Sequence, residues 1–193
     1  MAEWAGIAVT AVVTIVGLYL ANSLRLRTRA EVEKGVAEKR FPAYAALWTH
    51  TKVASPMRGS PLTKDERERL YPTLTNWYYD DGNGMLLTEQ TRNIYLNAKR
   101  NLTCEDKDLV PEALAQQVVA AKTASDREAI RGQASIDQLS LLRTSMRADV
   151  RIFTGPYKEA LKPGDAAFLE SCKVDLTQHP WRDALAPQTA PRA

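Results

Sequence analysis

The chain has 193 residues, enough for one ordinary domain and an appendage, since domains usually run to ~100–150 residues. Hydrophobic residues make up 45% of it and charged residues 25%, which excludes a wholly disordered or collagen-like chain. Two cysteines, far apart in the sequence, exclude a disulfide-built miniprotein, and two histidines leave little room for a histidine-rich metal site. The formal net charge of +3 is too small to indicate a nucleic acid as the partner.

An uncharged segment near the N-terminus predicts a single membrane-spanning helix. Residues 4–24 contain no charged side chain, and a helix of that length, about 30 Å, matches the hydrocarbon core of a bilayer. Trp4 and Tyr19 stand near its ends, where such rings favour the headgroup layer. A cleaved secretory signal is the alternative, but it requires basic residues before the apolar segment, where only Glu3 is charged. We therefore expect residues 1–24 to form a retained anchor.

The basic residues that follow predict the orientation of this anchor. Arg25, Arg27 and Arg29 come directly after it, so the positive-inside rule places the N-terminus outside the inner or plasma membrane and the rest of the chain in the cytoplasm. Residues 25–62 hold eight basic and three acidic side chains, a net charge of +5, whereas residues 63–193 hold 18 and 19, a net charge of −1. The basic charge is thus concentrated beside the lipid bilayer, where it favours an anionic surface.

Small residues within the anchor raise the question of a homodimer. Gly6, Thr10 and Thr14 recur every four residues, a spacing that lets two helices approach closely. Small residues are also common in spanning helices in general, so the same pattern is compatible with a monomeric anchor.

Beyond the anchor the sequence predicts an all-α protein with a compact helical domain over residues 42–185. A basic juxtamembrane helix is expected over residues 25–41, ending where the Phe41–Pro42 step interrupts it, and a frayed tail over residues 186–193. The residues that signal further helix starts are Pro42, Thr63 with Glu66 in a capping-box pattern, Thr88, Pro111 and Asp126. The helix that starts at Asp126 is expected to be long and to reach about Arg151. Two short helices are expected after it, near Tyr157–Leu161 and Asp165–Cys172. Pro72 predicts a kink and Gly132 an interruption, and Val150–Thr154 and Lys173–Leu176 are short strand candidates.

The densest group of potentially reactive side chains lies between Trp77 and Gly84. Asp80 and Asp81 could serve a carboxylate enzyme or hold a divalent cation, but an EF-hand loop counted from Asp81 would need glutamate where Arg92 stands. Ordinary helix termination explains the same residues. No nucleotide-binding, zinc-protease or serine-hydrolase motif occurs in the sequence, so we expect no cofactor, no metal and no assembled catalytic set.

Two groups of surface residues remain as candidate contacts. Arg143, Arg147 and Arg151 recur every four residues and would align on one helix face, where they could bind phosphates of lipid or nucleic acid; a solvated helix face is the alternative. Nucleic acid is disfavoured because no aromatic-rich basic surface accompanies the row. The aromatic side chains expected to contact a partner protein, where exposed, are Trp48, Tyr79 and Trp181.

These observations give a location and a fold but no specific activity. The leading hypothesis is a non-enzymatic protein-interaction or scaffold module held at the cytoplasmic face of the membrane. The alternatives are a tethered enzyme that uses Asp80 and Asp81, and a module that docks on anionic lipid or nucleic acid through the arginine row.

Overall fold

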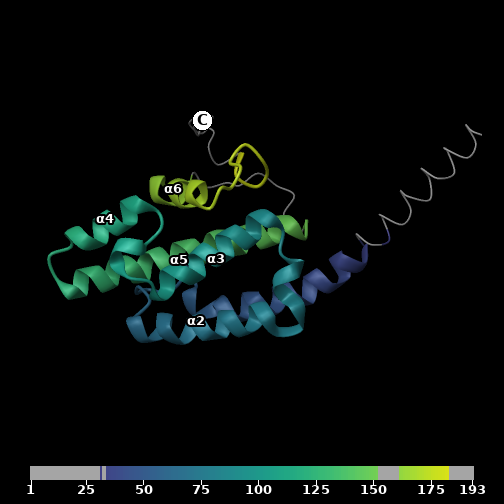
Figure 1. Ribbon diagram of the computed structural model, residues 1–193, viewed down its shortest axis with the longest axis horizontal. Coiled ribbons are helices and arrows are strands. Elements are labelled where there is room, and N and C mark those ends of the chain that lie inside the picture. The colour runs from purple at the N-terminus through teal and green to yellow at the C-terminus, as the bar shows by residue number, and fades with distance from the viewer. Residues whose placement is uncertain (1–30, 32–33, 152–160, 183–193) are drawn as a thin grey trace, which may run out of the picture. The chain divides into compact units, whose positions relative to one another are not determined.

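The computed structural model describes residue 31, residues 34–151 and residues 161–182. All regular structure within these residues is helical, and none of them lies in a strand, so the all-α prediction is confirmed for this part of the chain. The chain divides into two compact units, Met1–Lys39 and Arg40–Ala193. The second unit contains the labelled helices of Figure 1 and both cavities described below.

The predicted anchor and its flanks cannot be compared with the structure. Residues 1–24, with Trp4 and Tyr19, lie outside the described residues, and so do Arg25, Arg27 and Arg29 and the tail 186–193. No helix among the residues that are described is both long and apolar enough to cross a bilayer.

The helices follow one another with short connections. Residues 34–50 are helical and lead into a short 3-10 helix, η1 (Thr51–Ala54). The remaining elements are α2 (Lys64–Tyr79), η2 (Asp80–Leu86), α3 (Glu89–Thr103), η3 (Asp106–Asp108), α4 (Glu112–Ala120), α5 (Ala124–Asp149) and α6 (Pro163–Ser171). The strand candidate Lys173–Leu176 is not a strand, because Lys173 and Leu176 lie in turns and the two residues between them are irregular; most of the candidate Val150–Thr154 and of the helix expected near Tyr157–Leu161 lies outside the described residues.

Side-chain caps fix where three of the helices begin. The predicted capping box of α2 is confirmed: the Glu66 amide donates to the Thr63 hydroxyl at 3.3 Å, and the Thr63 amide donates to the Glu66 carboxylate at 2.8 Å. Thr88 caps α3, also as predicted. The prediction for α5 was wrong by one turn, because its cap is Thr123, whose hydroxyl accepts the amide of Asp126 at 3.0 Å.

Two residues expected to interrupt helices do not. The backbone is helical on both sides of Pro42. Proline has no amide hydrogen to donate to the carbonyl of Glu38, four residues earlier, but Glu38 is exposed, so water can bond to that carbonyl instead. Gly132 lies inside unbroken α5 and is required by a close approach: a Cβ there would stand 2.1 Å from the carbonyl oxygen of Leu62. The glycine therefore fixes a contact between α5 and the segment before α2. Pro72 also lies within continuous α2.

The core forms around α5. In Figure 1, α3 runs alongside α5, with α2 on one side of this pair and α4 and α6 on the other, in agreement with the contacts between these elements. The fully buried side chains that fill the space between them include Leu47, Leu74, Trp77, Tyr95, Leu139, Leu142, Phe168 and Trp181. α5 thus touches most of the other elements and carries residues of both cavities described next.

Two arginines are buried as well. Arg67 of α2 is 2% exposed, donates to the carbonyl of Leu102 at 2.8 Å and pairs with Glu128. Arg143 of α5 is 7% exposed and donates hydrogen bonds to the backbone carbonyls of Thr51 and Ala54. Both stand at helical spacing from apolar residues, Arg67 three residues before Leu70 and Arg143 four after Leu139, which explains why they face inward.

Candidate functional site

A cationic cavity opens where the helix over residues 40–50 meets the C-terminal half of α5. We call it the Trp48 cavity; its volume is about 380 Å³. Its lining residues are Trp48, Lys52, Ser55, Pro56, Ser140, Arg143, Thr144 and Arg147. Among these residues, all of them from the described part of the chain, three side chains are cations, three carry hydroxyls and none is a carboxylate.

Arg143 is held in place at the back of this cavity. Its Nη1 donates to the carbonyl of Thr51 at 3.1 Å and its Nη2 to that of Ala54 at 2.9 Å. These carbonyls belong to η1, at the C-terminal end of the helical segment. The side chain therefore satisfies a helix end and keeps a fixed orientation.

The indole of Trp48 joins the two arginines. The guanidinium carbon of Arg143 lies 5.8 Å from the Trp48 ring centroid, and that of Arg147 lies 5.9 Å from it. Burial, and then the charge of neighbouring Arg147, lower the pKa of Arg143, although an arginine stays protonated in any such site. The positive charge of the cavity is thus stabilised by an aromatic face and by backbone carbonyls.

An apolar groove of about 240 Å³ adjoins the Trp48 cavity and shares Trp48 and Arg147 with it. The other residues that line this apolar groove are Phe41, Tyr44, Ala45, Met146 and Val150. Phe41 is 57% exposed and Trp48 is 43% exposed, which is unusual for side chains of this size in a helical domain. A ligand with an anionic group next to an apolar group therefore matches the two hollows together.

Hydrogen bonds make the floor of the apolar groove rigid. The hydroxyls of Tyr44 and Thr91 both lie 2.7 Å from the Asp149 carboxylate, and that of Thr88 lies 3.1 Å from it. Burial, and then the Asp149 charge, raise the pKa of Tyr44, so it remains a neutral donor. One carboxylate thereby connects the 40–50 helix, the start of α3 and the end of α5.

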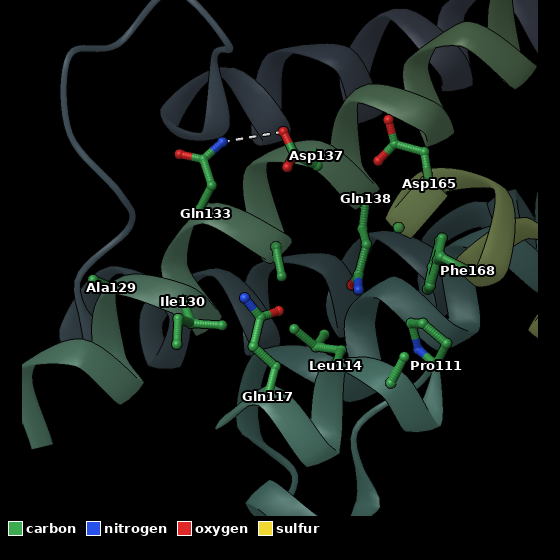
Figure 2. Close-up of a pocket in the computed structure, with 13 residues that line it drawn as sticks. Pro111, Leu114, Gln117, Ala129, Ile130, Gln133, Asp137, Gln138, Asp165 and Phe168 are labelled. Atoms are coloured by element: carbon green, nitrogen blue, oxygen red, sulfur yellow. Dashed lines mark hydrogen bonds between the residues drawn. The ribbon is translucent and has the colours of Figure 1, made fainter. Parts of the chain in front are cut away.

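A second and larger cavity lies between α4, α5 and α6, and we call it the α4–α6 cavity (Figure 2). Its volume is about 460 Å³. Figure 2 shows the carboxylates of Asp137 and Asp165 on one side of it and Leu114 and Pro111 on the other. Burial, and then the charge of Asp137, raise the pKa of Asp165, so a second negative charge is disfavoured there.

Gln133, Asp137 and Gln138 in the α4–α6 cavity are already paired with protein atoms. Gln133 donates to Asp137 at 3.1 Å, and Lys162 lies 3.8 Å from the same carboxylate. Gln138 donates to the carbonyl of Val110 and accepts from Asn101. Across the described ranges no group of three or more His, Cys, Asp or Glu side chains is placed to hold a metal ion. This cavity is therefore the weaker candidate, despite its volume.

The structure places the predicted carboxylate pair outside both cavities. Asp80 and Asp81 are both exposed where α2 ends, and Asp81 (φ 50°) and Gly82 (φ 70°) adopt the left-handed backbone of a turn. A tethered enzyme would need these carboxylates to converge in a hollow with another acid or a histidine, and they line neither cavity. Helix termination accounts for them.

The other predicted residues separate into exposed and buried ones. Trp48 is exposed, and so is Tyr79 at 74%, but the ring of Tyr79 meets that of Tyr78 edge to face and Tyr79 lines neither cavity. Trp181 is completely buried in the core, so it is not available for a surface contact. Trp181 belongs to a core whose other members begin at Ala43, and a local sequence pattern does not reveal membership of such a core.

The arginine row is also divided. Arg143 and Arg147 line the Trp48 cavity, whereas Arg151 follows the last turn of α5 with a left-handed φ of 55° and does not line it. Sequence reasoning missed Lys52 and Ser140. Their one available signal was the helical spacing of Lys52 from Trp48 and of Ser140 from Arg143 and Arg147.

Comparison of the chain with protein-family models, with curated proteins and with solved structures gives no match.

Proposed function

We propose that this chain is a single-pass, membrane-anchored helical protein whose cytoplasmic domain is a non-enzymatic interaction module. In this proposal a partner protein docks across the Trp48 cavity and the adjoining apolar groove. The observation that carries it is the exposure of Phe41 and Trp48 along the two adjoining hollows, beside the cations Lys52 and Arg143. Exposed aromatic and arginine side chains around a hollow are the composition that protein interfaces favour at their centres.

The cysteines support binding over covalent chemistry. Burial raises the pKa of the Cys172 thiol to about 12, and burial also raises that of Cys104. A nucleophilic cysteine requires the opposite shift, toward the thiolate. Neither residue lines the Trp48 cavity.

The anchor and its orientation rest on the sequence. An uncharged segment of bilayer length followed by three arginines supports a spanning helix with the domain on the cytoplasmic side. A partner would then meet the domain at the inner surface of the membrane.

Site-specific photocrosslinking in intact cells tests the docking surface. Phe41 is replaced by p-benzoylphenylalanine in the full chain, and we expect one discrete crosslinked protein, which Trp48→Ala in the same chain reduces at least about tenfold. The matched control carries the crosslinker at Val119, which is 64% exposed on α4 and lines neither cavity. Equal products from both positions, or none from position 41, would overturn the docking proposal.

Thiol labelling tests the orientation separately. A cysteine at exposed Ser125, in a Cys104→Ser background, gives an accessible thiol, while Cys172 stays buried. A membrane-impermeant maleimide should label Ser125→Cys only after the cells are permeabilised. Labelling of intact cells would show that the domain lies outside.

A further inference from the structure

We infer that the α4–α6 cavity binds a small organic cation, a primary ammonium group carried on an apolar body. This cavity is the weaker candidate for a protein partner, but a small ligand needs few polar contacts. It is separate from the docking surface, so either proposal can fail without the other. Three features support the inference: apolar walls around a hollow of ligand size, bonds that fix this hollow, and two carboxylates on one side of it.

The apolar walls come from three helices. Leu114 of α4 and Ile130 of α5 pack on a small apolar cluster of their own, whereas Phe168 of α6 belongs to the main core. All three line the cavity, so it is bounded by side chains of both clusters. Its volume of about 460 Å³ lies within the range of about 300–1,000 Å³ that small-molecule sites occupy. An apolar ligand body against these walls removes apolar surface from water, which favours binding.

Hydrogen bonds fix the start of α4, so the cavity is part of the fold. Asn101 of α3 bonds both backbone groups of Val110: its oxygen accepts from the amide at 3.1 Å and its nitrogen donates to the carbonyl at 2.5 Å. Gln138 of α5, which is 4% exposed and lines the cavity, donates to the same carbonyl at 3.2 Å. The first residues of α4 follow directly and are thereby tied to α3 and α5. A site that is formed beforehand loses little entropy when a ligand binds.

The carboxylates of Asp137 on α5 and Asp165 on α6 lie on the same side of this cavity (Figure 2). The Lys162 ammonium lies 3.8 Å from Asp137, but the lysine side chain is 70% exposed, and ion pairs in water contribute little. The charge of Lys162 lowers the pKa of Asp165, yet burial and the charge of Asp137 outweigh it and the pKa is raised. Lys162 therefore does not offset the repulsion between the two carboxylates, and a cationic ligand would stabilise both.

Acceptor sites remain for such a ligand. A carboxylate offers about four lone-pair sites, and the bond from Gln133 and the ion pair with Lys162 both use Oδ1 of Asp137. A primary ammonium is a compact charge with three donors, which suits two carboxylates that come from different helices. The apolar walls then contact the rest of the ligand.

Calorimetric titration of the purified full chain in neutral detergent micelles tests the site, with titration into empty micelles as the blank. The probe is 2-phenylethylamine, which is protonated at neutral pH. Its comparators are 2-phenylethanol and phenylacetate, which keep the apolar body but are neutral and anionic. We expect the amine to bind at least about tenfold more tightly than the alcohol, as gain of a charge-assisted hydrogen bond does, and phenylacetate to bind most weakly.

Variants separate the charge of the site from its shape. Asp137→Asn and Asp165→Asn should each weaken binding of the amine about tenfold and leave the affinity for 2-phenylethanol unchanged, a difference that a distorted cavity would not produce. Ala134→Leu places a larger side chain in the cavity and should weaken binding of both probes. Asp126→Asn is the matched control, because Asp126 is an exposed aspartate of α5 that lines neither cavity, and both affinities should stay unchanged.

Three results would overturn the inference: no binding of 2-phenylethylamine, equal affinity for 2-phenylethanol, or equal affinity for the amine in both aspartate variants and the wild type. Two further arms test other cations. Tighter binding of Nα-acetyl-lysine amide than of 2-phenylethylamine would assign the cavity to a lysine side chain of another protein. Binding of magnesium chloride without binding of the amine would assign it to a metal ion instead.

Discussion

The two cavities along α5 bury charges of opposite sign in different ways. In the Trp48 cavity, Arg143 is stabilised by two carbonyls at a helix end and by an indole face. In the α4–α6 cavity, Asp165 faces a second carboxylate, Asp137, and its pKa rises. A helix C-terminus is a natural site for a buried cation, whereas a pair of like charges in a hollow has no such support.

The same comparison shows why volume is a poor guide to the binding site. The α4–α6 cavity is the larger of the two, at about 460 Å³ against about 380 Å³, but Gln133, Gln138 and Asp137 in it already bond to protein atoms. In the Trp48 cavity, Arg143 retains donor hydrogens after it has satisfied its carbonyls. Groups that still have hydrogen-bonding capacity define the better candidate.

The largest effect on stability is expected at the contact between α5 and Leu62, because both cavities depend on the position of α5. Gly132→Ala places a Cβ 2.1 Å from the Leu62 carbonyl, so the backbone must move, and we expect a loss of about 3 kcal/mol or more in the free energy of unfolding. Urea denaturation measures it. Gly164→Ala on α6 is the matched control, since nothing lies within 4 Å of its Cβ, and it should be neutral or stabilise by up to ~1 kcal/mol. Similar losses at both glycines would contradict the close contact.

A smaller effect tests the support of the Trp48 cavity. Arg143→Met keeps an unbranched side chain but leaves the buried Thr51 and Ala54 carbonyls without their donor, which should cost roughly 2–4 kcal/mol in urea denaturation. Arg147→Met, at a half-buried position, should cost less than ~1 kcal/mol. Equal losses of stability in the two variants would show that the hydrogen bonds of Arg143 to Thr51 and Ala54 contribute no more to folding than Arg147 does.

The smallest effect concerns the α4–α6 cavity and has the opposite sign. Because the folded state raises the pKa of Asp165, its carboxylate disfavours folding once the pH exceeds the ordinary aspartate pKa of about 4. Asp165→Asn should therefore stabilise the protein at pH 7 by less than ~1 kcal/mol, and this gain should vanish as the pH falls below about 3. Thermal unfolding across this pH range measures it.

Asp175→Asn is the matched control for that pH dependence. Hydrogen bonds from Thr177 and Gln178 lower the pKa of Asp175, so its carboxylate form favours folding and the substitution should destabilise at pH 7. A gain from Asp165→Asn that does not change with pH would contradict the electrostatic origin.

The elements that the sequence predicts correctly are those set by neighbouring residues. The capping box of Thr63 and Glu66, the cap at Thr88 and the buried position of Trp77 all depend on contacts within one or two helical turns. The start of α5 was misassigned because Thr123 and Asp126 are both good caps, and the backbone conformation chooses between them.

The candidate site could be predicted only in part. Arg143 and Arg147 share a helix face, so their proximity follows from spacing, but their meeting with Trp48 and Lys52 depends on how distant helices pack. The continuity of the helix at Pro42 depends on solvent around Glu38, and the burial of Trp181 depends on the whole core. Neither is encoded in a short window of sequence.

The bond between Tyr44 and Asp149 spans 105 positions of the chain, which has a consequence for biosynthesis. Residues of the 40–50 helix leave the ribosome long before α5 is complete, so a nascent chain presents Phe41, Tyr44 and Trp48 with no floor beneath them. The proposed docking surface therefore forms only after α5 has been synthesised, and a chain truncated before α5 presents the same aromatic side chains as unprotected, aggregation-prone ones.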